Sequence, residues 1–311
     1  MFASSAGIPM LKKRAQLLQQ LRVFFYGLNV LEVDVPVLAS YSVTDPNLDA
    51  ISCHVGSTTH YLQTSPEFFM KRLLAMGSGD IFYLGKAFRQ DEQGSRHRPE
   101  FTMLEWYRSG FTDEDLIKET LSLLAILSPA TPTIRLSYQQ VFHQCTGLNP
   151  HVAITSELQD FAVAALQVDF NEESINFWLD LIFSFIVEPN LPDGIVVIED
   201  YPASQAALAR TAKNSRGLTT AKRFEIFWDR LELANGYWEL TDADEQMRRF
   251  AQDNQIRKQL NKPPQSADPK LIAALEQGIG ECAGIALGVD RLLMRLEGCE
   301  DIALVMPFAD G

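Results

Sequence analysis

The stretch FRQDEQGSRHRPEFTMLEWY, residues 88–107, joins two strand-like segments through a charged loop. Residues 80–89 before the loop and residues 100–107 after it are rich in aromatic and branched side chains, which are typical of strands. Gly94 and Pro99 in the polar segment between them are turn signals. The pattern predicts an antiparallel hairpin with a long charged loop.

The second of these strands has two different faces, because successive side chains point to opposite sides of a strand. One face is apolar enough to be core and carries Thr102, Leu104 and Trp106. The other mixes an aromatic ring, a carboxylate and a phenol, and carries Phe101, Met103, Glu105 and Tyr107. A carboxylate on a core strand needs a partner. These residues therefore leave two interpretations equally open: a solvated surface strand, or the floor of a pocket beside an anion-binding Arg89.

The bulk composition limits the possible functions. The chain has 311 residues, 46% of them hydrophobic, and a net charge of −13. Such a charge argues against broad, non-specific binding to nucleic acid. The four cysteines are far apart in the sequence, which predicts reduced thiols and no zinc site. No apolar run approaches the ~20 residues of a membrane span, and no signal-peptide pattern is present, so we expect a cytoplasmic protein.

Two segments precede the hairpin. Residues 10–26 predict an amphipathic helix, and residues 28–38 predict an extended edge segment that ends near Pro36. An exposed edge is either a folding element or an assembly surface. Further on, Ser65, Pro66 and Glu67 predict the start of a helix. Capping explains all three, although Glu67 facing a ligand amine is an alternative.

The segment after the hairpin predicts mostly helices, which lie within residues 112–190. The expected helices are 112–127, 137–145, 156–167 and 172–187. A continuous apolar run at 194–200 predicts a buried strand, and two more strands are expected at 224–228 and 231–240. Residues 241–260 predict a charged, solvated helix, and residues 268–278 a short one.

The two strands after residue 223 carry several carboxylates. Glu225 and Glu232 could hold Mg²⁺, which prefers one or two carboxylates together with substrate phosphates. A solvated acidic face is the alternative. Glu232 and Asn235 have opposite parity, so a single site requires a bulge near Ala234. The last pattern is a glycine-containing strand at 284–288 followed by a helix. Arg291 lies in the first turn of this helix, where the helix dipole disfavours a cation unless the cation binds an anion.

In order and content, these stretches resemble the catalytic core of class II aminoacyl-tRNA synthetases, and within it the lysyl branch. The segment ending at Pro36 is similar to motif 1, residues 88–107 with RHRPEFTMLEWY to motif 2, and residues 284–292 to motif 3. Residues 232–242, ELANGYWELTD, also fit the lysyl type. The resemblance implies an α+β fold, with an antiparallel sheet flanked by helices and a helical insertion at roughly 112–190. It also implies a single catalytic domain, 1–311, that forms a homodimer.

Lysyl-tRNA synthetases carry an anticodon-binding domain before motif 1, and only about ten residues precede it here. The chain therefore looks most like stand-alone paralogues that activate (R)-β-lysine with ATP and attach it to a lysine of elongation factor P. The resemblance implies ATP, Mg²⁺, β-lysine or lysine and this acceptor, with no stable tRNA binding and no membrane. Two alternatives stay open: a lysyl-tRNA-synthetase-like core that activates α-lysine for tRNA or another acceptor, and a catalytically inactive regulatory protein.

The resemblance also implies residue roles. Arg89 and Arg291 would be catalytic, through the phosphates of ATP. Other ATP contacts would come from Gln90, Asp91, His97, Arg98, Phe101, Glu232, Leu233 and Gly288. The amino acid would contact Ser65, Pro66, Glu67, Glu105, Tyr107, Asn235, Glu239 and Ala286. Mg²⁺ would be held by Glu225 and Glu232.

Three departures from the family pattern concern these contacts. Gln90-Asp91 replaces the usual Asn-Glu, and Arg98 replaces an Asn in the nucleotide loop. Ala286 stands where lysyl-tRNA synthetases usually have Gly. We expect its methyl group to reshape the amino-acid pocket toward a β-amino substrate.

Overall fold

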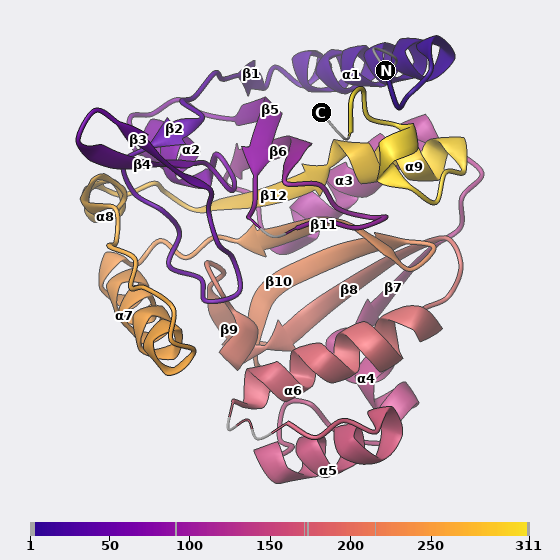
Figure 1. Cartoon of the computed structure of the whole chain (residues 1–311), viewed down its shortest axis with the longest axis vertical. Helices are drawn as coiled ribbons and strands as arrows, with labels where there is room; N and C mark the ends of the chain where they lie inside the picture. The colour runs from indigo at the N-terminus through magenta and orange to yellow at the C-terminus, as the bar shows by residue number, and fades with distance from the viewer. Residues whose placement is uncertain (1–3, 91, 171, 173, 215, 310–311) are drawn as a thin grey trace.

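A nine-stranded sheet forms the centre of the molecule (Figure 1). The computed structural model describes residues 4–90, 92–170, 172, 174–214 and 216–309. Across the sheet the strands are β1 (Leu31–Glu32), β5 (Ile81–Phe88), β6 (Glu100–Ser109), β12 (Cys282–Gly288), β11 (Leu231–Trp238), β10 (Thr219–Trp228), β8 (Ile195–Pro202) and β7 (Thr133–Ser137), with β9 (Thr211–Lys213) paired to β10. Only β1–β5 and β7–β8 are parallel pairs among the described residues. The predicted α+β fold with an antiparallel sheet is confirmed.

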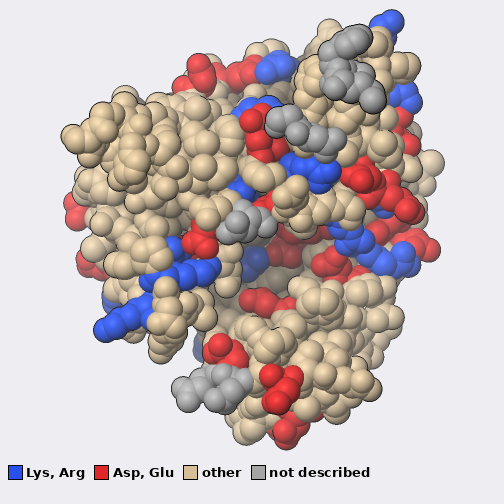
Figure 2. All heavy atoms as spheres, viewed as in Figure 1, with Lys and Arg blue, Asp and Glu red and all other residues tan. Residues whose placement is uncertain are grey.

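Helices cover both faces of this sheet. They are α1 (Ile8–Gly27), α2 (Glu67–Ala75), α3 (Asp113–Leu127), α4 (Tyr138–Thr146), α5 (Thr155–Leu166), α6 (Ile175–Ile182), α7 (Ala243–Gln259), α8 (Pro269–Gln277) and α9 (Val289–Glu297). One face packs against α1, α3 and α9. The other packs against α4, α5 and α6 at one end and against α2, α7 and α8 at the other. Figure 2 shows a hollow between these two groups of helices.

The β5–β6 hairpin has the predicted antiparallel pairing, from Ile81 opposite Tyr107 to Phe88 opposite Glu100. Leu104 and Trp106 are fully buried in the core beneath α1 and α3. The residues at odd positions lie on the opposite face and line a cavity. Of the two interpretations left open, the pocket floor is therefore correct for this strand.

The burial of β8 on both faces explains why residues 194–200 form a continuous apolar run. Ile195 and Val197 pack into the core with α3, and Val196 and Ile198 pack into the core with α4 and α6. A strand covered by helices on both faces has no solvated side, so its side chains need not alternate in polarity.

A buried polar network joins the first helix to β6 and to the start of α9. Arg14 of α1 pairs with Asp290 at the start of α9, with 2.6 Å between Nη1 and Oδ1. The other carboxylate oxygen of Asp290 accepts a hydrogen bond from the backbone N–H of Thr102 in β6, at 2.6 Å. Arg14 also donates to the Thr102 hydroxyl. One ion pair thus fixes three segments that are far apart in the sequence.

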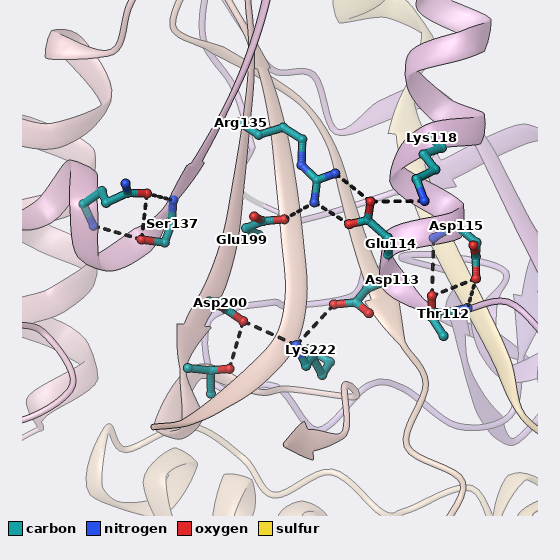
Figure 3. Close-up of polar contacts among 12 residues, drawn as sticks. Thr112, Asp113, Glu114, Asp115, Lys118, Arg135, Ser137, Glu199, Asp200 and Lys222 are labelled. Atoms are coloured by element: carbon teal, nitrogen blue, oxygen red, sulfur yellow. Dashed lines mark hydrogen bonds and ion pairs between the residues drawn. The ribbon is translucent and has the colours of Figure 1, made fainter. Parts of the chain in front are cut away.

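Edge strand β7 is held by a second polar network, shown in Figure 3. Arg135 of β7 lies between Glu114 of α3 and Glu199 of β8, with contacts of 2.9 Å and 2.6 Å. Thr112 caps α3 in a reciprocal capping box with Asp115, which confirms the predicted helix start. Strand β7 was not predicted, because its five residues depend on these contacts and on pairing with β8.

Two further differences from expectation matter for the site. Strands β3 (Ser52–Val55) and β4 (Thr58–Leu62) form a hairpin that was not predicted, and it makes a small second sheet with β2 (Leu38–Ala39). Helix α7 was expected to be solvated, which holds for most of its length, but Gln246, Phe250 and Arg257 are buried, and Arg257 is 1% exposed. Its guanidinium donates to the Asp45 carbonyl and pairs with Asp49 at 2.9 Å. Contacts with a distant loop thus bury a charged side chain that the helical pattern places in water.

Other expectations have mixed outcomes. All four cysteines are described and free. Among the described residues, no helix combines the length and apolar character that crossing a membrane requires. The division of the chain into one domain, with its insertion at 112–190 and no anticodon-binding domain, stays a prediction, as does the cytoplasmic location.

We predict that Arg14→Met lowers the free energy of unfolding by about 3–5 kcal/mol, because it leaves the buried Asp290 carboxylate without its cation. Urea unfolding measures this. The control is Lys13→Met on the same helix α1, which breaks an ion pair with Glu297 of α9. The Lys13 side chain is 52% exposed, so we expect a loss within about 1 kcal/mol. Equal losses in both variants would contradict the role given to Asp290.

Candidate active site

A cavity of about 1660 Å³ opens on the sheet face opposite α1. Its floor is formed by β6, β11 and β12, and its walls include α2, α6 and α7. Figure 2 shows acidic side chains on the wall of the hollow and basic side chains around it. The volume exceeds the ~300–1,000 Å³ typical of a pocket for one small molecule. The cavity therefore has room for more than one substrate.

A β-bulge brings the polar residues of β11 onto the cavity face. Glu225 of β10 is opposite Asn235, but Phe227 is opposite Glu232, so one extra residue of β11 lies between these pairs. The extra residue is Leu233. Glu232 and Asn235 are three residues apart, so in a regular strand without this bulge they would point to opposite faces. The bulge predicted near Ala234 is confirmed, and Glu232 and Asn235 both line the cavity.

One end of the cavity is cationic and aromatic. The Arg89 guanidinium lies over the Phe101 ring, 5.1 Å from its centroid. Arg89 also contacts Glu92 at 3.3 Å, and no described residue accepts a hydrogen bond from its buried Nε. Arg291 donates to the Glu232 carbonyl at 2.9 Å and contacts the His97 ring. Burial and the Arg291 charge lower the pKa of His97, which favours its neutral form.

The other end is acidic. The Glu105 carboxylate accepts hydrogen bonds from the Ser65 hydroxyl at 2.8 Å and from the Tyr107 hydroxyl at 2.9 Å. Burial, reinforced by the negative charge of Glu67, raises the pKa of Glu105 to about 8. Burial also raises the pKa of Glu239 to about 7, although Lys71 opposes that rise. Buried carboxylates that hold protons near neutral pH are prepared to receive a cation.

Two small residues of β12 shape this acidic end. A Cβ at Gly284 would lie 2.3 Å from the Tyr107 ring and 2.6 Å from Oε1 of Glu239. Ala286 is paired with Glu105 on one side and with Asn235 on the other. Directly paired residues project from the same face of a sheet. The Ala286 methyl group therefore lies between these two polar side chains on the cavity floor.

The structure brings together most of the predicted site residues. Those that line the cavity are Ser65, Glu67, Arg89, His97, Arg98, Phe101, Glu105, Tyr107, Glu232, Leu233, Asn235, Glu239, Ala286, Gly288 and Arg291. Arg98 lines it while donating to the His97 carbonyl of its own loop at 2.9 Å and pairing with Asp301 at 3.7 Å. Its guanidinium therefore stabilises the loop, in addition to any contact with a ligand.

Four of the predicted site residues are not among the described residues that line the cavity. Pro66 is buried at the start of α2, where it shapes the helix and does not line the cavity. Gln90 is exposed, outside the cavity lining, and its N–H donates to the Asp49 carbonyl at 2.9 Å. Glu225 is buried behind the lining. Asp91 lies outside the described residues. The ligand contacts predicted for Pro66, Gln90 and Glu225 stay predictions, since these three residues do not line the cavity.

Two charged residues at the site, Arg223 in the cavity lining and Lys71 behind it, were not predicted. Arg223 holds Glu225 at 2.5 Å and contacts Asn235 at 3.3 Å. Lys71 lies between Glu67 and Glu239. Both residues had a signal in the sequence, since Arg223 shares a strand face with Glu225 and Lys71 follows Glu67 by one helical turn.

The polar groups suggest what this cavity can bind. At the cationic end, two arginines and an aromatic ring suit a phosphate chain joined to a planar base. At the other end, buried carboxylates suit ammonium groups. Glu225 and Glu232 share a face and supply the one or two carboxylates that Mg²⁺ needs beside phosphates. The described residues contain no cluster of three or more His, Cys, Asp or Glu side chains that could hold a metal alone.

Known proteins similar to this chain are consistent with a cavity of this kind. The family model described as tRNA synthetases class II (D, K and N) matches residues 5–310. A protein of Pseudoalteromonas translucida is 45% identical over 99% of this chain and 97% of its own length. Proteins of Haemophilus ducreyi and Pasteurella multocida are each 44% identical over 98% of this chain, and over 94% and 96% of their own lengths. All three are named elongation factor P--(R)-beta-lysine ligase.

We predict that Gly284→Ala lowers the free energy of unfolding by about 1–3 kcal/mol, because the new methyl group collides with Tyr107 and Glu239. Urea unfolding measures the loss. Gly27→Ala is the matched control, since its Cβ would have no neighbour within 4 Å, and we expect no loss there. If both variants are equally stable, Tyr107 and Glu239 do not pack as described.

Proposed function

Because the chain belongs to the class II tRNA synthetases of the D, K and N group, we propose that it activates (R)-β-lysine with ATP and transfers it to a lysine side chain of elongation factor P. The observation that carries this proposal is the acidic end of the cavity. Three carboxylates, Glu67, Glu105 and Glu239, line the same cavity as the two arginines that would bind phosphate, Arg89 and Arg291. The activity in the relatives' names requires both an amine pocket and a phosphate site.

ATP would bind at the cationic end. Phe101 would stack on the adenine, with Arg89 beside it to hold the α-phosphate and Arg291 to hold the outer phosphates or cover the base. The buried Nε of Arg89, which has no partner among the described residues, supports this role, since a buried donor needs an acceptor. Glu225 and Glu232 would hold Mg²⁺, which neutralises phosphate charge. In the ligand-free protein Arg223 pairs with Glu225, so the metal would compete with that contact.

The amino acid would bind with its ammonium groups at Glu105, Glu67 and Glu239. One oxygen of its carboxylate would attack the α-phosphorus of ATP, and the bond from that phosphorus to the bridging oxygen would break to release pyrophosphate. The acceptor lysine amine would then attack the carbonyl carbon of the adenylate and lose a proton, and AMP would leave. Arg89 and Arg291 contribute by positioning and by stabilising developing charge, so no covalent nucleophile is required.

A homodimer is part of this proposal. Exposed apolar side chains cluster on α1 and β1, where Val23, Tyr26 and Leu31 are 63%, 53% and 55% exposed. Apolar side chains on an edge strand and its neighbouring helix suit a second copy of the chain. Light scattering on the purified protein tests this assembly.

Two other functions compete with the proposal. A core that charges tRNA with α-lysine is disfavoured by the net charge of −13. An inactive regulatory protein is disfavoured because the phosphate-binding arginines and the carboxylates are all present. Incubation of elongation factor P with this protein, ATP and β-lysine, followed by mass spectrometry, decides among the three. We expect the acceptor mass to increase by one β-lysyl group. An unchanged mass together with efficient tRNA charging would overturn the proposal, and no ATP–pyrophosphate exchange would favour the inactive protein.

We predict that Ala286→Gly shifts the preference from β-lysine toward α-lysine by about tenfold in kcat/KM, a methyl-sized effect. The methyl group lies between Glu105 and Asn235, so its removal reshapes the floor beneath the amino acid. Pyrophosphate exchange with each isomer measures the preference. An unchanged ratio would show that this methyl group does not select the isomer.

We predict that the affinity for β-lysine rises between pH 6 and pH 8. The raised pKa values of Glu105 and Glu239, about 8 and about 7, mean that these carboxyls carry protons at pH 6. A bound ammonium group favours the ionised carboxylate, so binding releases protons and strengthens as pH rises, by up to ~10-fold per pH unit for each proton released. The KM for β-lysine across this range measures the effect, with the KM for ATP as control. A KM that stays constant or increases with pH contradicts it.

A further inference from the structure

Lys71 is a buried charged residue beside the cavity, and the proposed reaction gives it no role. Its side chain is 2% exposed, and it is the only buried lysine in the part of the chain that the structure describes. Its Nζ lies 2.6 Å from Oε1 of Glu67 and 2.7 Å from Oε2 of Glu239. Lys71 itself does not line the cavity, whereas both of its carboxylate partners do. It is a cation placed behind the acidic wall.

The charges of this cluster can be counted. Glu67, Glu105 and Glu239 contribute three negative charges when ionised, and Lys71 contributes one positive charge, which leaves −2. The nearby Arg210 donates to the backbone carbonyl of Glu239 and pairs with Glu281, so its charge is already matched. The remaining −2 equals the charge needed by two ammonium groups.

The geometry also leaves acceptors for those two groups. Lys71 contacts one oxygen of Glu239, and the other, Oε1, is buried with no hydrogen-bond partner among the described residues. Glu105 receives hydrogen bonds from two neutral hydroxyl groups and is not paired with a cation. A buried carboxylate without a cation is costly. Glu105 and Glu239 therefore each retain capacity for one ammonium group.

We propose that Lys71 is a positioning residue that fixes Glu67 and Glu239 and reduces the charge of the pocket from three to two, which matches the pocket to an amino acid with two ammonium groups. The inference rests on the proposed function and adds the reason why a diamino acid is selected. Burial alone would lower the pKa of Lys71, but Glu239 and Glu67 together raise it, so Lys71 stays charged. Without this cation, three buried carboxylates could not all remain ionised.

A purely structural ion pair between α2 and the end of β11 is the alternative. A structural tether, when removed, lowers stability and affects every substrate alike. A charge-setting residue, when removed, affects the amino acid and spares ATP, which binds at the other end of the cavity. Kinetics with each substrate varied in turn separate these two cases.

The test compares the wild-type protein with Lys71→Met in pyrophosphate exchange. We expect the KM for β-lysine to rise at least about tenfold, because a buried charge pair is broken, and the KM for ATP to change by less than about twofold. Lys118→Met is the matched control, since Lys118 also follows a glutamate by four residues but its side chain is 65% exposed. We expect the control to leave both KM values unchanged.

A second variant separates charge from contact. Glu67→Gln combined with Lys71→Met replaces the ion pair by neutral groups and restores the charge of −2. We expect its KM for β-lysine to be lower than that of Lys71→Met. We also expect it to retain a preference for β-lysine over 3-aminohexanoic acid, which lacks one ammonium group, because Glu105 and Glu239 still supply two negative charges. If Lys71→Met does not fold, this double variant carries the test alone, and loss of the preference overturns the inference.

The remaining outcomes are also decisive. An unchanged KM for β-lysine in Lys71→Met, an equal rise in both KM values, or a double variant no better than the single one overturns the role of Lys71. No β-lysine-dependent exchange by the wild-type protein overturns the proposed function instead.

Discussion

The ion pair between Arg14 and Asp290 is the contact on which the site depends. It connects α1 to the start of α9 and, through the Thr102 backbone, to β6. Phe101 precedes Thr102 and Arg291 follows Asp290, so the residues proposed to hold ATP are each next to a member of this network. A buried pair of charges tolerates little displacement, because separation leaves both ions unpaired. The position of the first helix therefore determines the geometry of the nucleotide site.

Strand periodicity explains how much of the site the sequence predicts. The alternation along β6 separates core from cavity residues correctly, and the parity conflict between Glu232 and Asn235 correctly requires a bulge. Both arguments succeed because a central strand has two faces and each side chain must lie on one of them. The ligand roles came from the family resemblance, and they agree with the cavity lining for most residues. Among the described residues the exceptions are Pro66 and Gln90, which contribute to the backbone framework around the site, and Glu225, which is buried behind the lining.

The features that could not be predicted depend on tertiary contacts. Lys71 has the spacing of an ordinary surface pair with Glu67, and only the arrival of Glu239 from β11 makes it part of the acidic cluster. Likewise, the helical pattern of α7 predicts that Arg257 is solvated, and only its contact with Asp49 from a distant loop explains its burial. Periodicity reports which side of an element is apolar. It does not report which distant carboxylate covers a charged residue.

The bulge at Leu233 offsets β11 by one residue, so the rest of the strand is sensitive to length as well as to composition. A substitution in this strand alters one side chain, whereas the loss of one residue between Asn235 and Glu239 would turn part of the strand over and move an amide or a carboxylate toward the hydrophobic core. Insertions and deletions are therefore far more harmful here than in the loop after Phe88. The length of β11 is an evolutionary constraint in its own right, and engineering of this enzyme by segment exchange must preserve it.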